Sequence, residues 1–209
     1  MKYELMNPRL LEIPLPGGEL AMGGSQSWYP GLWKRISGCG PTAASNLIWY
    51  MARSRSDMGL LWDTGNGEKS RFLGLMLEFF AYLTPGLKGV NKSSIFTSGV
   101  NRFCADRGVE LQTHVLEIPK APGERPDIDT ASNFIVAALQ ADSPVGFLNL
   151  NSGTESNLEA WHWVTVIGLE TETKTAVIID KGRSLEIHLD EWLETSKLGG
   201  AMVYLQAKE

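Results

Sequence analysis

The sequence contains few cysteines and histidines and no long apolar run. Two cysteines and three histidines occur among 209 residues, without the closely spaced pairs that structural zinc sites usually show. No metal or other cofactor is therefore expected. The first 19 residues include three glutamates and no apolar stretch long enough for a signal peptide or a membrane-spanning helix. We therefore expect a cytoplasmic protein that does not enter a membrane.

A basic tract is also missing. The formal net charge is −5, and acidic and basic residues are interspersed. No block of lysine and arginine is available to follow a phosphate backbone, so nucleic acid is not an expected partner. Without an export signal, the two cysteines are not expected to form a disulfide scaffold, because the cytosol keeps thiols reduced.

The remaining composition is that of an ordinary globular protein. Hydrophobic residues make up 43% and charged residues 21% of the chain, and a chain of this length can bury one sizeable core. We therefore expect one domain over residues 1–209, of unknown oligomeric state. Glycine and proline recur near the N-terminus and predict an irregular lead-in over residues 1–25.

Hydrophobic periodicity divides the chain into a helical first half and a strand-rich second half. This order predicts an α+β fold in which N-terminal helices pack on a C-terminal antiparallel β-sheet. A site is then expected between the two layers. The predicted helices are 39–53, 69–83, 94–107, 130–141 and 190–195, and the predicted strands are 109–118, 145–150, 161–169, 175–180, 185–189 and 201–205.

Cys39 is the candidate nucleophile. It lies between Gly38 and Gly40, which would let a substrate approach closely, and a predicted helix begins at this point with Pro41 in its first turn. The positive end of a helix dipole favours a thiolate over a thiol and helps to stabilise an oxyanion. The ordinary role of a free cysteine is that of a small buried residue, and we assign that role to Cys104.

A thiol nucleophile needs an imidazole base, and three histidines are available. Apolar residues at alternate positions indicate that His114 and His188 lie on the wet faces of their strands. His162 begins a strand whose two faces are both apolar, so a polar ring there needs a reason. A core histidine bonded to backbone carbonyls is the usual alternative, but the presence of Cys39 favours a base.

Asp180 is the candidate partner of the His162 imidazole. A hairpin with its loop at 171–173 would place Gly168 opposite Ala176, so that His162 and Asp180 share one face as diagonal neighbours. A shift of the register by one residue would separate them. The alternative is a turn-forming aspartate that bonds to its own backbone.

Gln26 is the candidate oxyanion donor, because a neutral amide can point an N–H at developing negative charge. The alternative is a loop glutamine without a role in chemistry.

With these residues the sequence resembles the papain-like cysteine peptidase superfamily, particularly bacterial proteins akin to bacteriocin-processing peptidases. Those proteins carry a Gln, then Cys-Gly-Pro-Thr at a helix start, then His-Trp-Val and a later Asp, and the same elements occur here in that order. The resemblance covers residues 26–205. It implies a papain-like fold with Cys39 as nucleophile, His162 as base, Asp180 as the group that orients the base and Gln26 as oxyanion donor.

The intervals between these elements are longer than in compact members of the superfamily. The interval from Cys39 to His162 is extended by the predicted helices in residues 69–107, which we interpret as a helical insertion. The resemblance implies thiol-dependent hydrolysis of an amide bond in a peptide or peptide-like substrate. The alternatives are acyl transfer at the same site, as in the phytochelatin synthase branch, and an inactive binding domain with the same fold.

Overall fold

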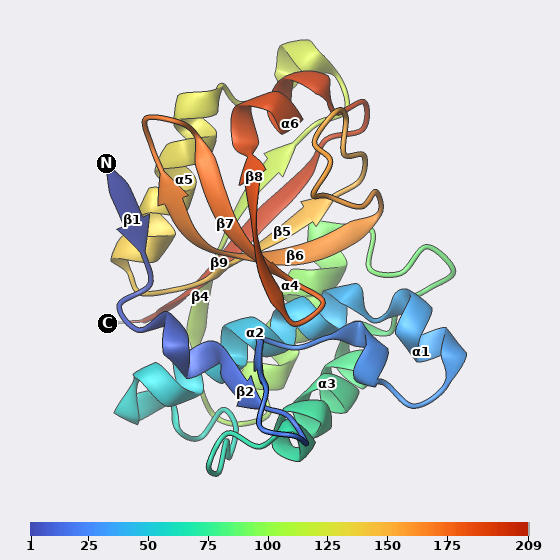
Figure 1. Cartoon of the computed structure of the whole chain (residues 1–209), viewed down its shortest axis with the longest axis vertical. Coiled ribbons are helices and arrows are strands. Elements are labelled where there is room, and N and C mark those ends of the chain that lie inside the picture. The colour runs from blue at the N-terminus through green and yellow to red at the C-terminus, as the bar shows by residue number, and fades with distance from the viewer. Residues whose placement is uncertain (209) are drawn as a thin grey trace.

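One seven-stranded sheet separates two groups of helices (Figure 1). The computed structural model describes residues 1–208. The strands of this sheet are β1 Lys2–Glu4, β4 Leu111–Ile118, β5 Val145–Asn149, β6 His162–Glu170, β7 Thr175–Asp180, β8 Arg183–His188 and β9 Gly200–Ala207. Their order is β4-β9-β5-β6-β7-β8, with β1 added to β6, and every pairing is antiparallel.

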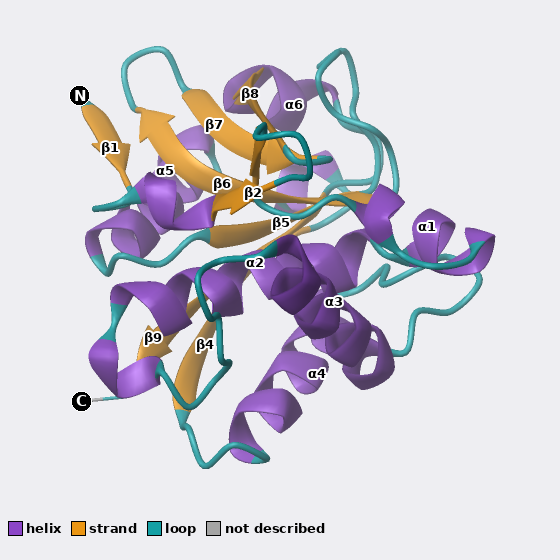
Figure 2. Cartoon of the chain, turned by 60° about the horizontal axis from the view of Figure 1, so that its bottom comes forward, coloured by secondary structure: helices purple, strands orange, loops and turns teal. Residues whose placement is uncertain are grey.

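The helices cover both faces of this sheet. They are α1 Leu32–Ser37, α2 Cys39–Ser54, α3 Lys69–Leu83, α4 Ser93–Ala105, α5 Ile128–Gln140 and α6 Leu189–Thr195. Phe96 of α4 stacks on Trp163, whereas Trp192 of α6 contacts Phe147, which pairs with Val164. Because neighbouring side chains of a strand point to opposite faces, α4 and α6 lie on opposite sides of β6. Figure 2 shows α2, α3 and α4 gathered on one side of the strands. The predicted α+β class is confirmed.

Helix α2 lies at the centre of the molecule. Its residues are buried from Cys39 to Met51 on every side, as expected for a helix that neighbouring elements surround. Helices α3 and α4 pack against it, and Phe79 of α3 stacks on Phe103 of α4 at 4.3 Å between ring centroids. The predicted insertion, residues 69–107, therefore contributes to the same hydrophobic core as α2.

The N-terminal lead-in is more ordered than predicted. It contains β1 and a small hairpin, so the prediction of an irregular segment over residues 1–25 is wrong in part. These strands are three residues each, too short to show an extended alternation. Strand β1 is stabilised by pairing with the distant β6, whereas β2 and β3 pair with each other. The short elements are β2 Glu12–Pro14, β3 Leu20–Met22 and the 3₁₀ helices Pro8–Leu11, Gln26–Trp28, Ser56–Met58 and Pro122–Glu124.

Most other elements lie where periodicity placed them. Helix α3 and strand β7 agree with the predicted bounds to the residue, and the other predicted elements differ at their ends. Helix α1 was not predicted. No helix within residues 1–208 combines the length and apolarity that crossing a membrane requires.

The lead-in is tied to the core by a buried asparagine. The Asn46 Oδ1 atom of α2 accepts a hydrogen bond from the backbone N–H of Gly24 at 2.9 Å. Its Nδ2 atom donates to the Thr165 hydroxyl of β6 at 3.0 Å. One side chain thus joins the segment before Gln26, the central helix and the central strand, which fixes their relative positions.

Candidate active site

The four predicted site residues line one small cavity at the seam between α2 and the sheet. Cys39 is the first residue of α2, His162 the first of β6 and Asp180 the last of β7. Gln26 begins a short 3₁₀ helix of the N-terminal segment. Residues that lie far apart in the sequence therefore meet where the layers meet, as the sequence predicted.

His162 and Asp180 form a buried hydrogen-bonded pair. The Nε2 atom of His162 lies 2.7 Å from Oδ1 of Asp180, and their side chains are 7% and 11% exposed. Burial lowers the pKa of His162, but the hydrogen bond to Asp180 and the interaction with Cys39 outweigh it and raise this pKa to about 10. The ring is therefore an imidazolium, whose Nε2–H donates to the carboxylate and whose Nδ1–H remains for the Cys39 sulfur.

The turn after β7 places Asp180 beside the ring. Asp180 pairs with Arg183 across a two-residue turn, Lys181-Gly182, in which both residues have positive φ, 49° and 79°. Such a turn matches the twist of a hairpin and needs no side-chain cap. The carboxylate of Asp180 is thus bonded to His162, which argues against the turn-capping alternative.

The predicted pairing of the preceding hairpin is wrong near its loop. Gly168 pairs with Val177 rather than with Ala176, and the loop comprises the four residues 171–174. A β-bulge between Val166 and Gly168 takes up the difference. Beyond the bulge, Thr165 pairs with Ile179, the register that puts His162 and Asp180 on one face.

The glycines beside Cys39 have a different role from the one predicted. A Cβ atom at Gly38 would lie 2.4 Å from the Tyr29 ring, and one at Gly40 would lie 2.7 Å from Cβ of Val90. They therefore allow other parts of the protein, rather than a substrate, to approach the start of α2. Cys39 itself is only 6% exposed.

The residue before His162 has an unusual backbone conformation. Trp161 has a φ of 58°, in the left-handed region that non-glycine residues rarely occupy. Its side chain is 46% exposed, and the Lys88 ammonium lies 5.6 Å from its ring centroid. The chain thus bends sharply as it brings His162 into the cavity.

Gln26 contributes an amide that no protein group fully satisfies. It lines the cavity with Cys39 and His162, and its buried Oε1 atom has no hydrogen-bond partner among residues 1–208. Buried polar atoms are normally paired. An amide in this position is therefore suited to a polar group of a ligand.

The other histidines and the second cysteine lie outside this site. His188 is exposed, as predicted. The placement of His114 on a wet face is wrong, because its ring stacks on Tyr204 at 4.4 Å while Val115 is 41% exposed. Burial raises the pKa of the Cys104 thiol to about 12, which makes it a poor nucleophile.

Two features of the site were not predicted. Trp163 donates its indole N–H to the carbonyl of Val90, which joins the loop between α3 and α4 to β6. Lys181 lines the cavity and forms an ion pair with Glu159. The sequence holds no local signal for either contact, because both partners are distant in the chain.

Comparison with protein-family models and with curated proteins finds no match. Within residues 1–208 no three histidine, cysteine, aspartate or glutamate side chains lie together in a way that could hold a metal ion.

The arrangement of thiol, imidazole, carboxylate and amide is suited to nucleophilic attack on a carbonyl group.

Replacing Asp180 with Asn should lower the pKa of His162 from about 10 towards or below the ordinary value of about 6.5. Burial lowers this pKa, and the substitution removes the carboxylate whose hydrogen bond raises it most. An NMR titration of protein with isotope-labelled histidine measures this pKa. The exposed ring of His188 gives a reference signal that the variant should leave unchanged. Titration of His162 near the ordinary value in the wild type would contradict the assignment of an imidazolium.

Proposed function

We propose that this chain is a papain-like thiol hydrolase that cleaves an amide bond in a peptide or peptide-like substrate. The observation that carries the proposal is the buried pair of His162 and Asp180 in the same cavity as Cys39, at the start of a 16-residue helix. Burying such a pair costs desolvation free energy, so perturbed groups of this kind concentrate at functional sites. Two free cysteines also suit a reducing compartment such as the cytoplasm.

In the proposed reaction, Nδ1 of His162 holds the proton that the Cys39 thiol has lost, and the sulfur attacks the amide carbonyl carbon. The start of α2 and the amide of Gln26 stabilise the charge that forms on the carbonyl oxygen. The carbonyl forms again as the C–N bond breaks, and His162 gives its proton to the leaving amine. Asp180 accepts the Nε2–H bond throughout and stabilises the imidazolium.

A water molecule then completes the reaction. His162 removes a proton from the water, the oxygen attacks the thioester carbon, and the C–S bond breaks to release the carboxylic acid and the Cys39 thiolate, with the proton left on His162. Acyl transfer would share every step up to the thioester and would differ only in the nucleophile that attacks it. The reaction product therefore distinguishes the two outcomes.

Access to Cys39 requires side chains to move. The cavity beside the thiol holds only about 10 Å³, room for roughly one water molecule. Gln26, Asp180 and Lys181 line both this cavity and a larger groove next to it. Lys181 is the side chain that a substrate entering from the groove would displace, because it is 43% exposed whereas Asp180 is held by His162.

Iodoacetamide should alkylate Cys39 rapidly at about pH 6, because an imidazolium beside the sulfur favours the thiolate, which is the nucleophilic form. Intact-mass spectrometry with peptide mapping would follow the reaction. His162→Ala should abolish the rapid phase, whereas Cys104→Ser should leave it unchanged. If Cys39 reacts no faster than an ordinary thiol, the chain is better described as an inactive binding domain.

Gln26→Ala should slow acylation of Cys39 by an activated peptide ester by about 100-fold, because removal of one oxyanion donor typically costs this much. Alkylation by iodoacetamide provides the control, since that displacement develops no oxyanion and should keep its rate. Stopped-flow measurement of the released alcohol gives the acylation rate. Equal slowing of both reactions would show that Gln26 acts on the thiol or on the fold instead.

A further inference from the structure

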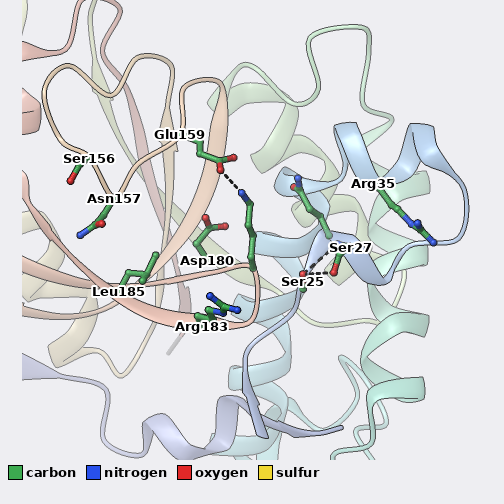
Figure 3. A pocket seen from close by; sticks show the side chains of 11 residues that line it. Ser25, Ser27, Arg35, Ser156, Asn157, Glu159, Asp180, Arg183 and Leu185 are labelled. Atoms are coloured by element: carbon green, nitrogen blue, oxygen red, sulfur yellow. Dashed lines mark hydrogen bonds and ion pairs between the residues drawn. The ribbon is translucent and has the colours of Figure 1, made fainter. Parts of the chain in front are cut away.

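A polar groove of about 620 Å³ opens beside the His162–Asp180 pair (Figure 3). One wall is formed by the segment before α2, and the other by the β7–β8 hairpin and the end of the loop between β5 and β6. Figure 3 shows Ser25, Ser27 and Arg35 on the side opposite Arg183 and Leu185. Because the groove shares three lining residues with the cavity at Cys39, it is continuous with the proposed site.

The charges in this groove are not balanced. Its lining includes three cations, Arg35, Lys181 and Arg183, and two carboxylates, Glu159 and Asp180. Asp180 is bonded to His162 and Glu159 is paired with Lys181. Among residues 1–208, neither arginine forms an ion pair with a carboxylate. Two guanidinium groups are thus available to a ligand.

These arginines differ from most others in the chain. Arg53, Arg55, Arg71, Arg102, Arg107 and Arg125 all donate guanidinium hydrogen bonds to carbonyl or carboxylate oxygens. Arg35 donates only from Nε, to the carbonyl of Tyr29 at 2.7 Å, which orients the side chain and leaves its terminal nitrogens available. Arg183 and the distant Arg9 form no such bond within the described residues. Of these two, only Arg183 lines the groove.

The wall that faces the segment before α2 is held in place by a buried carboxylate. Glu155 is 4% exposed and accepts hydrogen bonds from the backbone N–H groups of Asn157 and His188, both at 2.8 Å. The Asn157 amide in turn donates to the carbonyl of Glu186 at 2.7 Å. A wall fixed by such bonds loses little conformational entropy when a ligand binds.

We infer that this groove binds a carboxylate of the substrate through Arg183, so that peptides with an Asp or Glu side chain near the scissile amide are preferred. A guanidinium group matches a carboxylate in a planar, two-point geometry. Leu185 is the only large apolar residue of the lining, so an apolar side chain would gain little there. The inference rests on the proposed function, because it concerns the substrate of that site. Binding can nevertheless be measured without any reaction at Cys39.

The test uses fluorescein-labelled short peptides in which one Glu occupies a different position in each, with the matching Gln peptides as controls. Each is made with a free or an amidated C-terminus, which separates a side-chain carboxylate from a terminal one. Fluorescence anisotropy with the full chain carrying Cys39→Ala measures affinity without turnover. Glu should bind about fivefold to tenfold more tightly than Gln at one or more positions, and added salt should reduce the ratio.

The variants decide which groups are responsible. In the Cys39→Ala background, Arg183→Gln should bring the Glu-to-Gln ratio close to one, and Arg183→Lys should keep part of it. Arg9→Gln, which removes an exposed arginine outside the groove, should leave the ratio unchanged. A ratio of one at every position, or a ratio that survives Arg183→Gln, overturns the inference. A preference for the free C-terminus alone would assign the groove to a terminal carboxylate.

Failure of this inference can be distinguished from failure of the proposed function. If Cys39 in the wild type reacts as a thiolate but no Glu preference exists, the hydrolase proposal is retained and the inference that the groove binds a carboxylate is rejected. If the Glu preference depends on Arg183 but Cys39 is unreactive, the groove is a binding site on a chain without the proposed chemistry.

Discussion

The hydrogen bond between His162 and Asp180 is the interaction on which the arrangement of the site depends. Both side chains are nearly buried, and removing one partner of a buried charged pair typically costs about 3–5 kcal/mol. Because the two residues end neighbouring strands, their bond favours one register of β6 against β7 at the end nearest Cys39. Helix α2 is held on the same strand by the bond from Asn46 to Thr165. The thiol, ring and carboxylate are thus placed by core elements, which position a site more precisely than loops.

A β-bulge makes this register compatible with the loop that joins the two strands. Thr165 pairs with Ile179 near the site, whereas Gly168 pairs with Val177 on the loop side. One extra residue in β6 absorbs the difference. Had the register of the loop side continued to the end of the hairpin, Asp180 would point to the other face of the sheet, because successive strand residues alternate. A local irregularity therefore preserves the contact on which the proposed chemistry relies.

Periodicity and residue type predicted much of the fold and the membership of the site, but not its details. The long apolar helices and the buried strands were predicted because each contains several residues of one pattern. The three-residue strand at Lys2–Glu4 was missed, since its pairing with β6 supplies what its own sequence does not. The reason for Gly38 and Gly40 became clear only from the packing of Tyr29 and Val90. Such contacts between distant segments leave no local trace in a sequence.

A crystal structure of the chain treated with a peptide aldehyde would test the role of Cys39 most directly. The central claim is that Cys39 is a nucleophile whose attack on a carbonyl is supported by His162 and Gln26. We predict a covalent bond from Cys39 Sγ to the aldehyde carbon, with the resulting oxygen within hydrogen-bond reach of the Gln26 side-chain amide. An unmodified Cys39 in crystals where the aldehyde is bound, or an adduct on another residue, would contradict it.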